Sequence, residues 1–311
     1  MRALVLIFAV FCLSTSVVFI KDSTMPPGMM AAGRLLLAAA ILSPVFLRDL
    51  RRCRREGVRN DFRAVIIPAL WFALHFVTWI RGARMIPAAH SSLIINLVPV
   101  AMPFLLVIWL KERLSRAEII GTVCALAGGA VLAVSDYRFS PEHLPGDALC
   151  FGSMLCLTVY LVLARRNRTF HSVWLYTVPL YAISGLFCLL LSAPLEVSQW
   201  RWPVFAEFRL LMGLTLVCTV VGHTLLANAM RQFPGQTVAL FNLGQFVFAG
   251  AMAVPIFLEK PRFSFYLAGA LIVAGAMASI LWKHKDTAPV APETAEREAE
   301  TADAPVARPL P

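Results

Sequence analysis

Charged residues are scarce in this sequence: Asp, Glu, Lys and Arg make up 15% of its 311 residues, while 59% are hydrophobic. An ordinary soluble domain carries about 25% charged residues, which cover its surface. The charges here gather in short clusters between long apolar runs. Because a membrane-spanning helix needs roughly 20 mostly apolar residues, this distribution predicts an all-α polytopic membrane protein.

Signatures of common chemistry are also missing. The sequence has no GxxxxGK[ST] phosphate-binding loop, no HExxH, and no CxxC pair among its seven cysteines. It has no Gly-flanked serine with a histidine and no cluster of aspartates that would indicate an intramembrane active site. No Asp or Glu falls in the middle of an apolar run, so the usual carboxylate proton carrier is absent. We expect no catalytic residue, no cofactor and no metal ion.

The net charge of +10 would suggest a nucleic-acid partner in a soluble protein. Here the basic residues stand at the ends of apolar segments, and no basic stripe is interleaved with aromatic residues. We therefore expect no nucleic acid, and expect the basic residues to contact anionic membrane lipid.

Orientation follows from where the Lys and Arg residues fall. About twice as many lie on one side of the expected membrane as on the other, with the densest group in the segment 48–63. The positive-inside rule then places both termini in the cytoplasm and requires an even number of spans. The expected location is the bacterial inner (plasma) membrane.

Ten apolar segments stand out as transmembrane helices. They are 3–20, 28–47, 64–83, 91–110, 117–135, 146–164, 172–193, 210–230, 235–258 and 264–282. Beyond them comes a tail, 284–311, rich in Ala, Pro and Glu, which cannot bury an apolar core and is expected to be disordered.

The chain also repeats itself. A shift of 147 residues aligns Arg84 with Arg231, Pro87 with Pro234, Glu112 with Glu259, and Gly128 with Gly275. The expected units are therefore a first five-helix repeat over 1–136 and a second over 146–283. Five spans in each half insert the two halves in opposite directions, and such inverted repeats are common in transporters, with the solute site near the midplane.

These residues resemble the ten-helix branch of the drug/metabolite transporter superfamily, the EamA-like transporters. The motifs that carry the resemblance are His75-Phe76-x-x-Trp79, Pro99, Lys111-Glu112-Arg113-Leu114, Gly121, Gly128-Gly129, Gly222-His223-x-Leu225-Leu226-x-Asn228, Glu259 and Gly275. The resemblance covers nearly the whole chain except the tail. It implies two inverted five-helix halves, a central cavity, and export or exchange of small organic metabolites. The sequence departs from the family at Gly244-Gln245-Phe246, where such transporters often carry an acidic residue followed by Pro.

Arg34 is the first candidate for a solute contact, because it lies within the second apolar run. An arginine there must pair or reach a wet cavity, and its planar fork suits a carboxylate or phosphate. The alternative is an arginine that reaches to the outer interface or bonds to carbonyl groups of a neighbouring helix.

His75 and His223 occupy nearly equivalent positions in the two halves, and Trp79 follows His75 on the same helix face. Histidines that face a cavity could carry protons, and Trp79 could stack on a ring or a cation of the solute. The alternative is that each imidazole bonds to a neighbouring helix, with Trp79 as packing.

Further candidates are uncharged polar residues inside the spans: Asn96, Tyr160, Asn228, Asn242 and Gln245. Together they predict a polar but nearly uncharged cavity. The alternative is that they hold helices together, at roughly 0.6 kcal/mol for each interhelical hydrogen bond.

The leading interpretation is a secondary transporter, an exporter or exchanger of small metabolites such as amino acids, working by alternating access. A non-transporting assembly factor or sensor is the alternative, and an intramembrane enzyme is a weaker one. The expected partners are a small-molecule solute and membrane lipid, with a homodimer left open.

Overall fold

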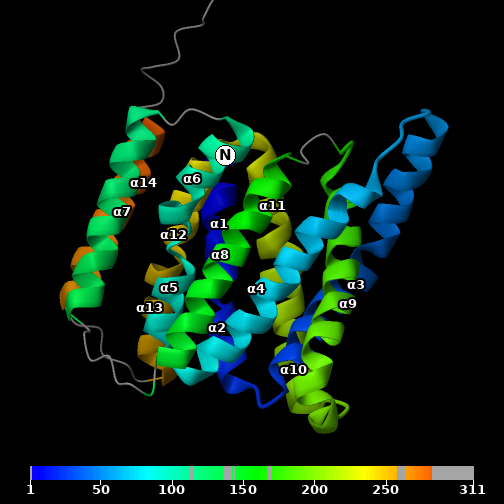
Figure 1. Ribbon diagram of the computed structural model, residues 1–311, viewed down its shortest axis with the longest axis horizontal. Helices are drawn as coiled ribbons and strands as arrows, with labels where there is room; N and C mark the ends of the chain where they lie inside the picture. Colours follow the sequence, from blue (N-terminus) through cyan, green and yellow to red (C-terminus); the bar gives the residue numbers. More distant parts are fainter. Residues whose placement is uncertain are drawn as a thin grey trace, which may run out of the picture.

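The computed structural model describes residues 2–111, 115–135, 142, 144–166, 170–257 and 263–281, and these ranges contain helices and no strand. Figure 1 shows them as one helical bundle. The α-helices are α1 (Arg2–Ser14), α2 (Ser16–Asp22), α3 (Pro27–Arg55), α4 (Ile66–Met85), α5 (Ala88–Ile95), α6 (Val98–Leu110), α7 (Arg116–Ser135), α8 (Leu144–Arg166), α9 (Val173–Glu196), α10 (Phe205–Gly213), α11 (Thr224–Gln232), α12 (Gly235–Leu243), α13 (Gln245–Phe257) and α14 (Phe263–Leu281). The predicted tail 284–311, with Glu112 and Glu259, lies outside the described residues.

Eight segments of the described chain are long and apolar enough to cross a membrane. They are Leu4–Asp22, Pro27–Arg55, Phe62–Met85, Ser91–Leu110, Leu144–Arg165, Val173–Gln199, Phe205–Gln232 and Gly235–Ile256. Large apolar side chains point outward from them, such as Phe104 on α6, as helices in contact with lipid allow. The chain is therefore a polytopic helical membrane protein. The other two predicted spans fall on α7 and α14, and the number ten stays a prediction.

The second span is longer than the sequence analysis placed it. We expected a helix over 28–47 followed by a basic loop, but α3 continues to Arg55, so that boundary is wrong. Arginine is a good helix former, and cations near a helix C-terminus are stabilised by the helix dipole. The helix stops where Gly57, with φ of 70°, adopts the left-handed conformation that follows many helix ends.

Several helices are interrupted inside the bundle. Asn96 and Leu97 separate α5 from α6, and Pro99, at the start of α6, has no N–H to continue the ladder. Gly244 separates α12 from α13. Between α10 and α11 the backbone widens into a π-helix, η4 (Leu214–His223). Interrupted and widened turns free backbone groups inside a bundle, and π-turns recur at functional sites.

Three pairs of helices pack along their length: α3 with α9, α4 with α8, and α7 with α14. Glycines allow the close approach in two of these pairs. A Cβ on Gly82 of α4 would lie 2.8 Å from the carbonyl oxygen of Gly146 on α8, and one on Gly275 of α14 would lie 2.9 Å from that of Gly121 on α7. Gly121 and Gly275 therefore let α7 and α14 approach closely.

Candidate functional site

Arg34 is completely buried in the middle of the bundle, on the face of α3 that meets η4. Its Nε–H donates to the Thr219 hydroxyl at 2.9 Å, and its guanidinium carbon lies 4.3 Å from the centroid of the Phe76 ring. The terminal nitrogens Nη1 and Nη2 have no hydrogen-bond partner among the described residues. A buried guanidinium with two unpaired nitrogens is costly, and a bound anion would offset that cost. The sequence alone left open that the Arg34 side chain reaches the outer membrane interface. That alternative is wrong, because Arg34 is enclosed in the bundle.

The π-helix η4 positions the partner of Arg34. The Thr219 hydroxyl donates to the carbonyl of Leu214, five residues earlier, at 3.2 Å, while it accepts from Arg34. The Tyr181 hydroxyl of α9 lies 3.4 Å from the Thr219 carbonyl and 3.0 Å from the Thr224 hydroxyl. Helices α3 and α9 are thereby tied to the widened turn at the level of the guanidinium.

Aromatic rings line the same region. Phe72 stacks on Tyr160 of α8, with ring centroids 4.2 Å apart. His223 meets the rings of Phe72 and Phe76 edge-on at 5.1 and 5.2 Å. His75 also contacts both phenylalanines, at 6.1 and 4.7 Å. The two histidines and Tyr160 thus belong to one ring cluster with Arg34.

His75 and His223 differ in their hydrogen bonds. The Ser153 hydroxyl of α8 lies 2.7 Å from the His75 carbonyl and 2.8 Å from His75 Nδ1. Because a hydroxyl has one proton, donation to the carbonyl leaves Nδ1–H of His75 as the donor to Ser153. His223 Nδ1, in contrast, has no partner among the described residues. His75 therefore ties α4 to α8, whereas Nδ1 of His223 stays unpaired among the described residues.

Trp79 continues the cluster toward one end of the bundle. Its ring stacks on His75 at 5.8 Å, and its indole N–H donates to the Ser91 hydroxyl at 3.2 Å. Both its polar atom and one ring face are thus engaged by the protein. This geometry favours packing over direct solute contact.

The amide side chains form a second group, at the helix interruptions. Asn96 donates to the Ser92 carbonyl at 2.7 Å, Asn242 lies 3.4 Å from the Asn96 oxygen, and Gln245 donates to the Asn242 oxygen at 2.6 Å. The structure joins these three predicted residues in one chain of amides between α5 and α12–α13. Asn228, on α11, is half-buried and has no hydrogen bond to either group among the described residues.

Sequence reasoning missed Thr219, Tyr181, Phe72 and Ser153. Phe72 could have been found, because it stands one helical turn before His75 and Phe76 and extends the same aromatic face. Thr219, Tyr181 and Ser153 gave no local signal, since their partners lie far away in the chain. Within the described ranges, no group of three or more His, Cys, Asp or Glu residues is arranged to hold a metal ion.

One end of the bundle, beside this site, is held by carboxylates. Glu196 at the end of α9 accepts from Arg81 of α4 and from the N–H of Gly28 at the start of α3, both at 2.8 Å. Glu207 of α10 accepts from the Ser23 hydroxyl at 2.5 Å and from the Thr24 hydroxyl at 2.7 Å. We call these contacts the α2–α3 clasp, because they hold the linker between α2 and α3.

The opposite end is held by contacts of amide, hydroxyl and arginine side chains. Gln236 of α12 donates to the Pro99 carbonyl at 3.1 Å and to the Thr122 hydroxyl of α7 at 2.6 Å. Arg165 of α8 donates to the Phe233 carbonyl at 2.5 Å. The ring cluster around Arg34 therefore lies between these two groups of contacts.

A bundle of apolar helices that encloses a cationic and aromatic cluster fits a protein that carries solutes across a membrane. The chain belongs to the EamA-like transporter family, whose model matches residues 1–134 and 144–281. The chain is similar to proteins that are named as transporters or exporters. The aromatic amino acid exporter YddG of Ancylobacter novellus is 24% identical over 291 residues, covering 89% of this chain and 94% of that protein. The uncharacterized transporter YvbV of Bacillus subtilis is 22% identical over 266 residues, covering 84% of each.

The fold is also similar to that of solved structures. One crystal structure superposes with a TM-score of 0.72 at 19% identity, covering 92% of this chain and 99% of the other. At that identity the likeness concerns the fold alone.

Proposed function

We propose that this protein is a secondary transporter that carries small organic acids with an apolar or aromatic body, such as aromatic amino acids, by alternating access. The observation that carries the proposal is the pair of unpaired Arg34 nitrogens buried among aromatic rings. A carboxylate can accept from both nitrogens at once, and the rings of Phe72 and Phe76 offer faces to an apolar body. The exporter relative, named for aromatic amino acids, supports this substrate class.

Two inverted five-helix repeats, over 1–136 and 146–283, complete the proposal, with 284–311 as a tail. A two-fold axis between such halves would pair α3 with α9 and α7 with α14, which are two of the long contacts. The same axis would map the α4–α8 contact onto a contact between α1 and η4. Those two elements do pack together. The interruption at Leu97 corresponds to the one at Gly244 under the 147-residue shift. Rocking of one half against the other would open the site alternately.

The test uses purified protein in liposomes loaded with unlabelled phenylalanine or tryptophan, with uptake of the labelled amino acid followed by counterflow. We expect uptake above that of liposomes without the protein. Arg34→Gln should lower this uptake at least tenfold, because hydrogen bonds to charged groups contribute about 1.5–3 kcal/mol. Arg34→Lys keeps the charge without the planar fork and should give an intermediate loss. Arg209→Gln is the matched control, since Arg209 also stands over a phenylalanine ring but is exposed.

Two outcomes would contradict the proposal. Uptake that Arg34→Gln leaves unchanged would remove the carboxylate anchor. No flux of any metabolite across a broad panel of amino and organic acids would favour the alternative, a non-transporting assembly factor or sensor.

A further inference from the structure

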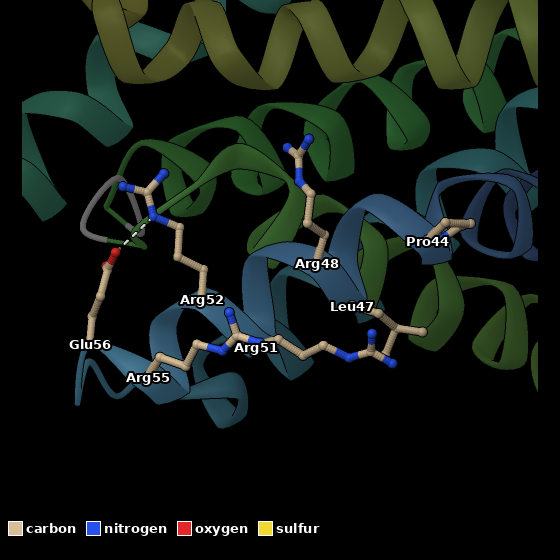
Figure 2. Close-up of a pocket in the computed structure, with 7 residues that line it drawn as sticks. All are labelled: Pro44, Leu47, Arg48, Arg51, Arg52, Arg55 and Glu56. Atoms are coloured by element: carbon tan, nitrogen blue, oxygen red, sulfur yellow. Dashed lines mark hydrogen bonds and ion pairs between the residues drawn. The ribbon is translucent and has the colours of Figure 1, made fainter.

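Four arginines recur on one face of the last turns of α3: Arg48, Arg51, Arg52 and Arg55. Their spacing of three, one and three residues places them on one stripe of the helix. They line an open cavity of about 720 Å³ together with Pro44, Leu47 and Glu56. Figure 2 shows their side chains projecting from the end of the helix. None of the residues that line this cavity belongs to the Arg34 cluster.

Only part of this charge is compensated by the protein. Arg48 pairs with Asp49 at 3.2 Å, and Arg52 pairs with Glu56 at 2.8 Å. The hydrogen bond from Arg52 lowers the pKa of the Glu56 carboxyl, so Glu56 is ionised at neutral pH. Arg51 and Arg55, which are exposed neighbours at i and i+4, have no hydrogen-bond or ion-pair partner among the described residues. The cavity therefore retains two positive charges.

The same exposed face becomes apolar deeper along α3. Leu47 is 45% exposed and Ile41 is 40% exposed, and Pro44 lies between them on the exposed side. From Ile41 to Arg55 the face extends roughly 21 Å along the helix axis. The end of α3 stands at the edge of the bundle, next to α9 (Figure 1). A cationic end followed by an apolar stripe at the bundle edge matches the profile of a phospholipid.

We propose that this face of α3 binds an anionic phospholipid, with its phosphate held by Arg51 and Arg55 and its acyl chain along Leu47, Pro44 and Ile41. The guanidinium fork fits phosphate oxygens in pairs, and each arginine near an anionic surface contributes to lipid attraction. A soluble phosphate would contact the arginines alone and would leave the apolar stripe without a ligand. The site is independent of the Arg34 cluster, so it stands or falls separately from transport.

The test measures lipid retained by the purified, detergent-solubilised protein in native mass spectrometry. Phosphatidylglycerol and phosphatidylcholine of equal chain length are titrated in parallel. We expect phosphatidylglycerol to bind at least fivefold more tightly, and the double variant Arg51→Gln/Arg55→Gln to lose that preference. The matched control, Arg59→Gln/Arg63→Gln, removes the same charge from exposed positions just beyond the cavity and should keep it.

A second arm separates a lipid from a free phosphate. Glycerol phosphate, which shares the headgroup chemistry, should fail to displace phosphatidylglycerol, and Leu47→Ser should weaken lipid binding at least twofold. Equal binding of the two lipids by the wild-type protein would overturn the proposal. So would an equal loss in the control variant, which would indicate a diffuse charge effect, or displacement by glycerol phosphate at concentrations similar to those of the lipid.

Discussion

At the scale of single residues, Thr219 decides how Arg34 is held. Its hydroxyl is the one described hydrogen-bond acceptor for the guanidinium, and it sits on a π-turn. Thr219→Val should therefore lower the free energy of unfolding by about 1–3 kcal/mol, because it leaves a third buried donor unpaired. Thr215→Val is the control, since Thr215 is equally buried but bonds only to the carbonyl of Leu211, four residues earlier in α10. Thermal unfolding in detergent compares the two, and equal losses would contradict the assignment.

His223 is the residue at which we expect pH to act on transport. A proton on His223 would add a second positive charge near Arg34, and a bound carboxylate would offset it. His223→Gln should abolish the dependence of phenylalanine transport on a pH gradient. His75→Gln, whose imidazole is engaged by Ser153, should retain that dependence with weakened stability. Measurement of transport with and without a gradient separates the two, and pH-driven transport that survives in His223→Gln contradicts the role.

At the scale of elements, burial rather than distance should set the strength of ion pairs. Arg81–Glu196 and Arg52–Glu56 have the same 2.8 Å separation. The Glu196 side chain is only 3% exposed, whereas both partners of the second pair are open to solvent. A double-mutant cycle with Gln should give a coupling of about 1 kcal/mol or more for the α2–α3 clasp, and none measurable for the exposed pair. Equal couplings would contradict this expectation.

Helix contacts offer a second prediction at this scale, because two glycines on neighbouring helices differ in their surroundings. A Cβ on Gly82 would meet the Gly146 carbonyl oxygen at 2.8 Å and the Cys150 sulfur at 2.9 Å, whereas one on Gly152 meets nothing within 4 Å. Gly82→Ala should destabilise the protein by about 1–3 kcal/mol through overpacking. Gly152→Ala should stabilise it slightly, by about 0.4–1 kcal/mol, since alanine loses less backbone entropy. Thermal unfolding of both variants checks the opposite signs.

At the scale of the whole molecule, the proposed topology predicts where each end lies. A fluorescent protein fused after Pro311 should be bright and a periplasmic phosphatase at the same place inactive, because basic loops favour the cytoplasm. A phosphatase inserted after Ser198, between α9 and α10, should be active instead. The proposed topology has an odd number of membrane crossings between Ser198 and Pro311. The same reporter result at both places would contradict it.

Local properties of the sequence are enough to predict the membrane class, the places of most spans and the position of Arg34 inside an apolar helix. The thickness of the bilayer sets the length of each apolar run, and the basic residues beside a run set its orientation. Both effects can be recognised from one segment of the sequence at a time. The cost of an arginine within such a run is equally local. The end of α3 was misplaced because an arginine-rich stretch reads as a loop, although arginine propagates a helix well.

What only the tertiary structure decided is which polar groups meet. Arg34 and Thr219 stand 185 residues apart, and His75 and Ser153 stand 78 apart, so no local pattern could pair them. Packing of α3 on η4 left two guanidinium nitrogens of Arg34 without partners among the described residues. Packing of α4 on α8 placed the Ser153 hydroxyl beside His75 as its hydrogen-bond partner. Apolar helices by themselves could pack in many arrangements, each with different pairs of polar groups in contact. Close packing selects one arrangement, in which some polar groups hold helices together and others, such as the terminal nitrogens of Arg34, have no partner among the described residues.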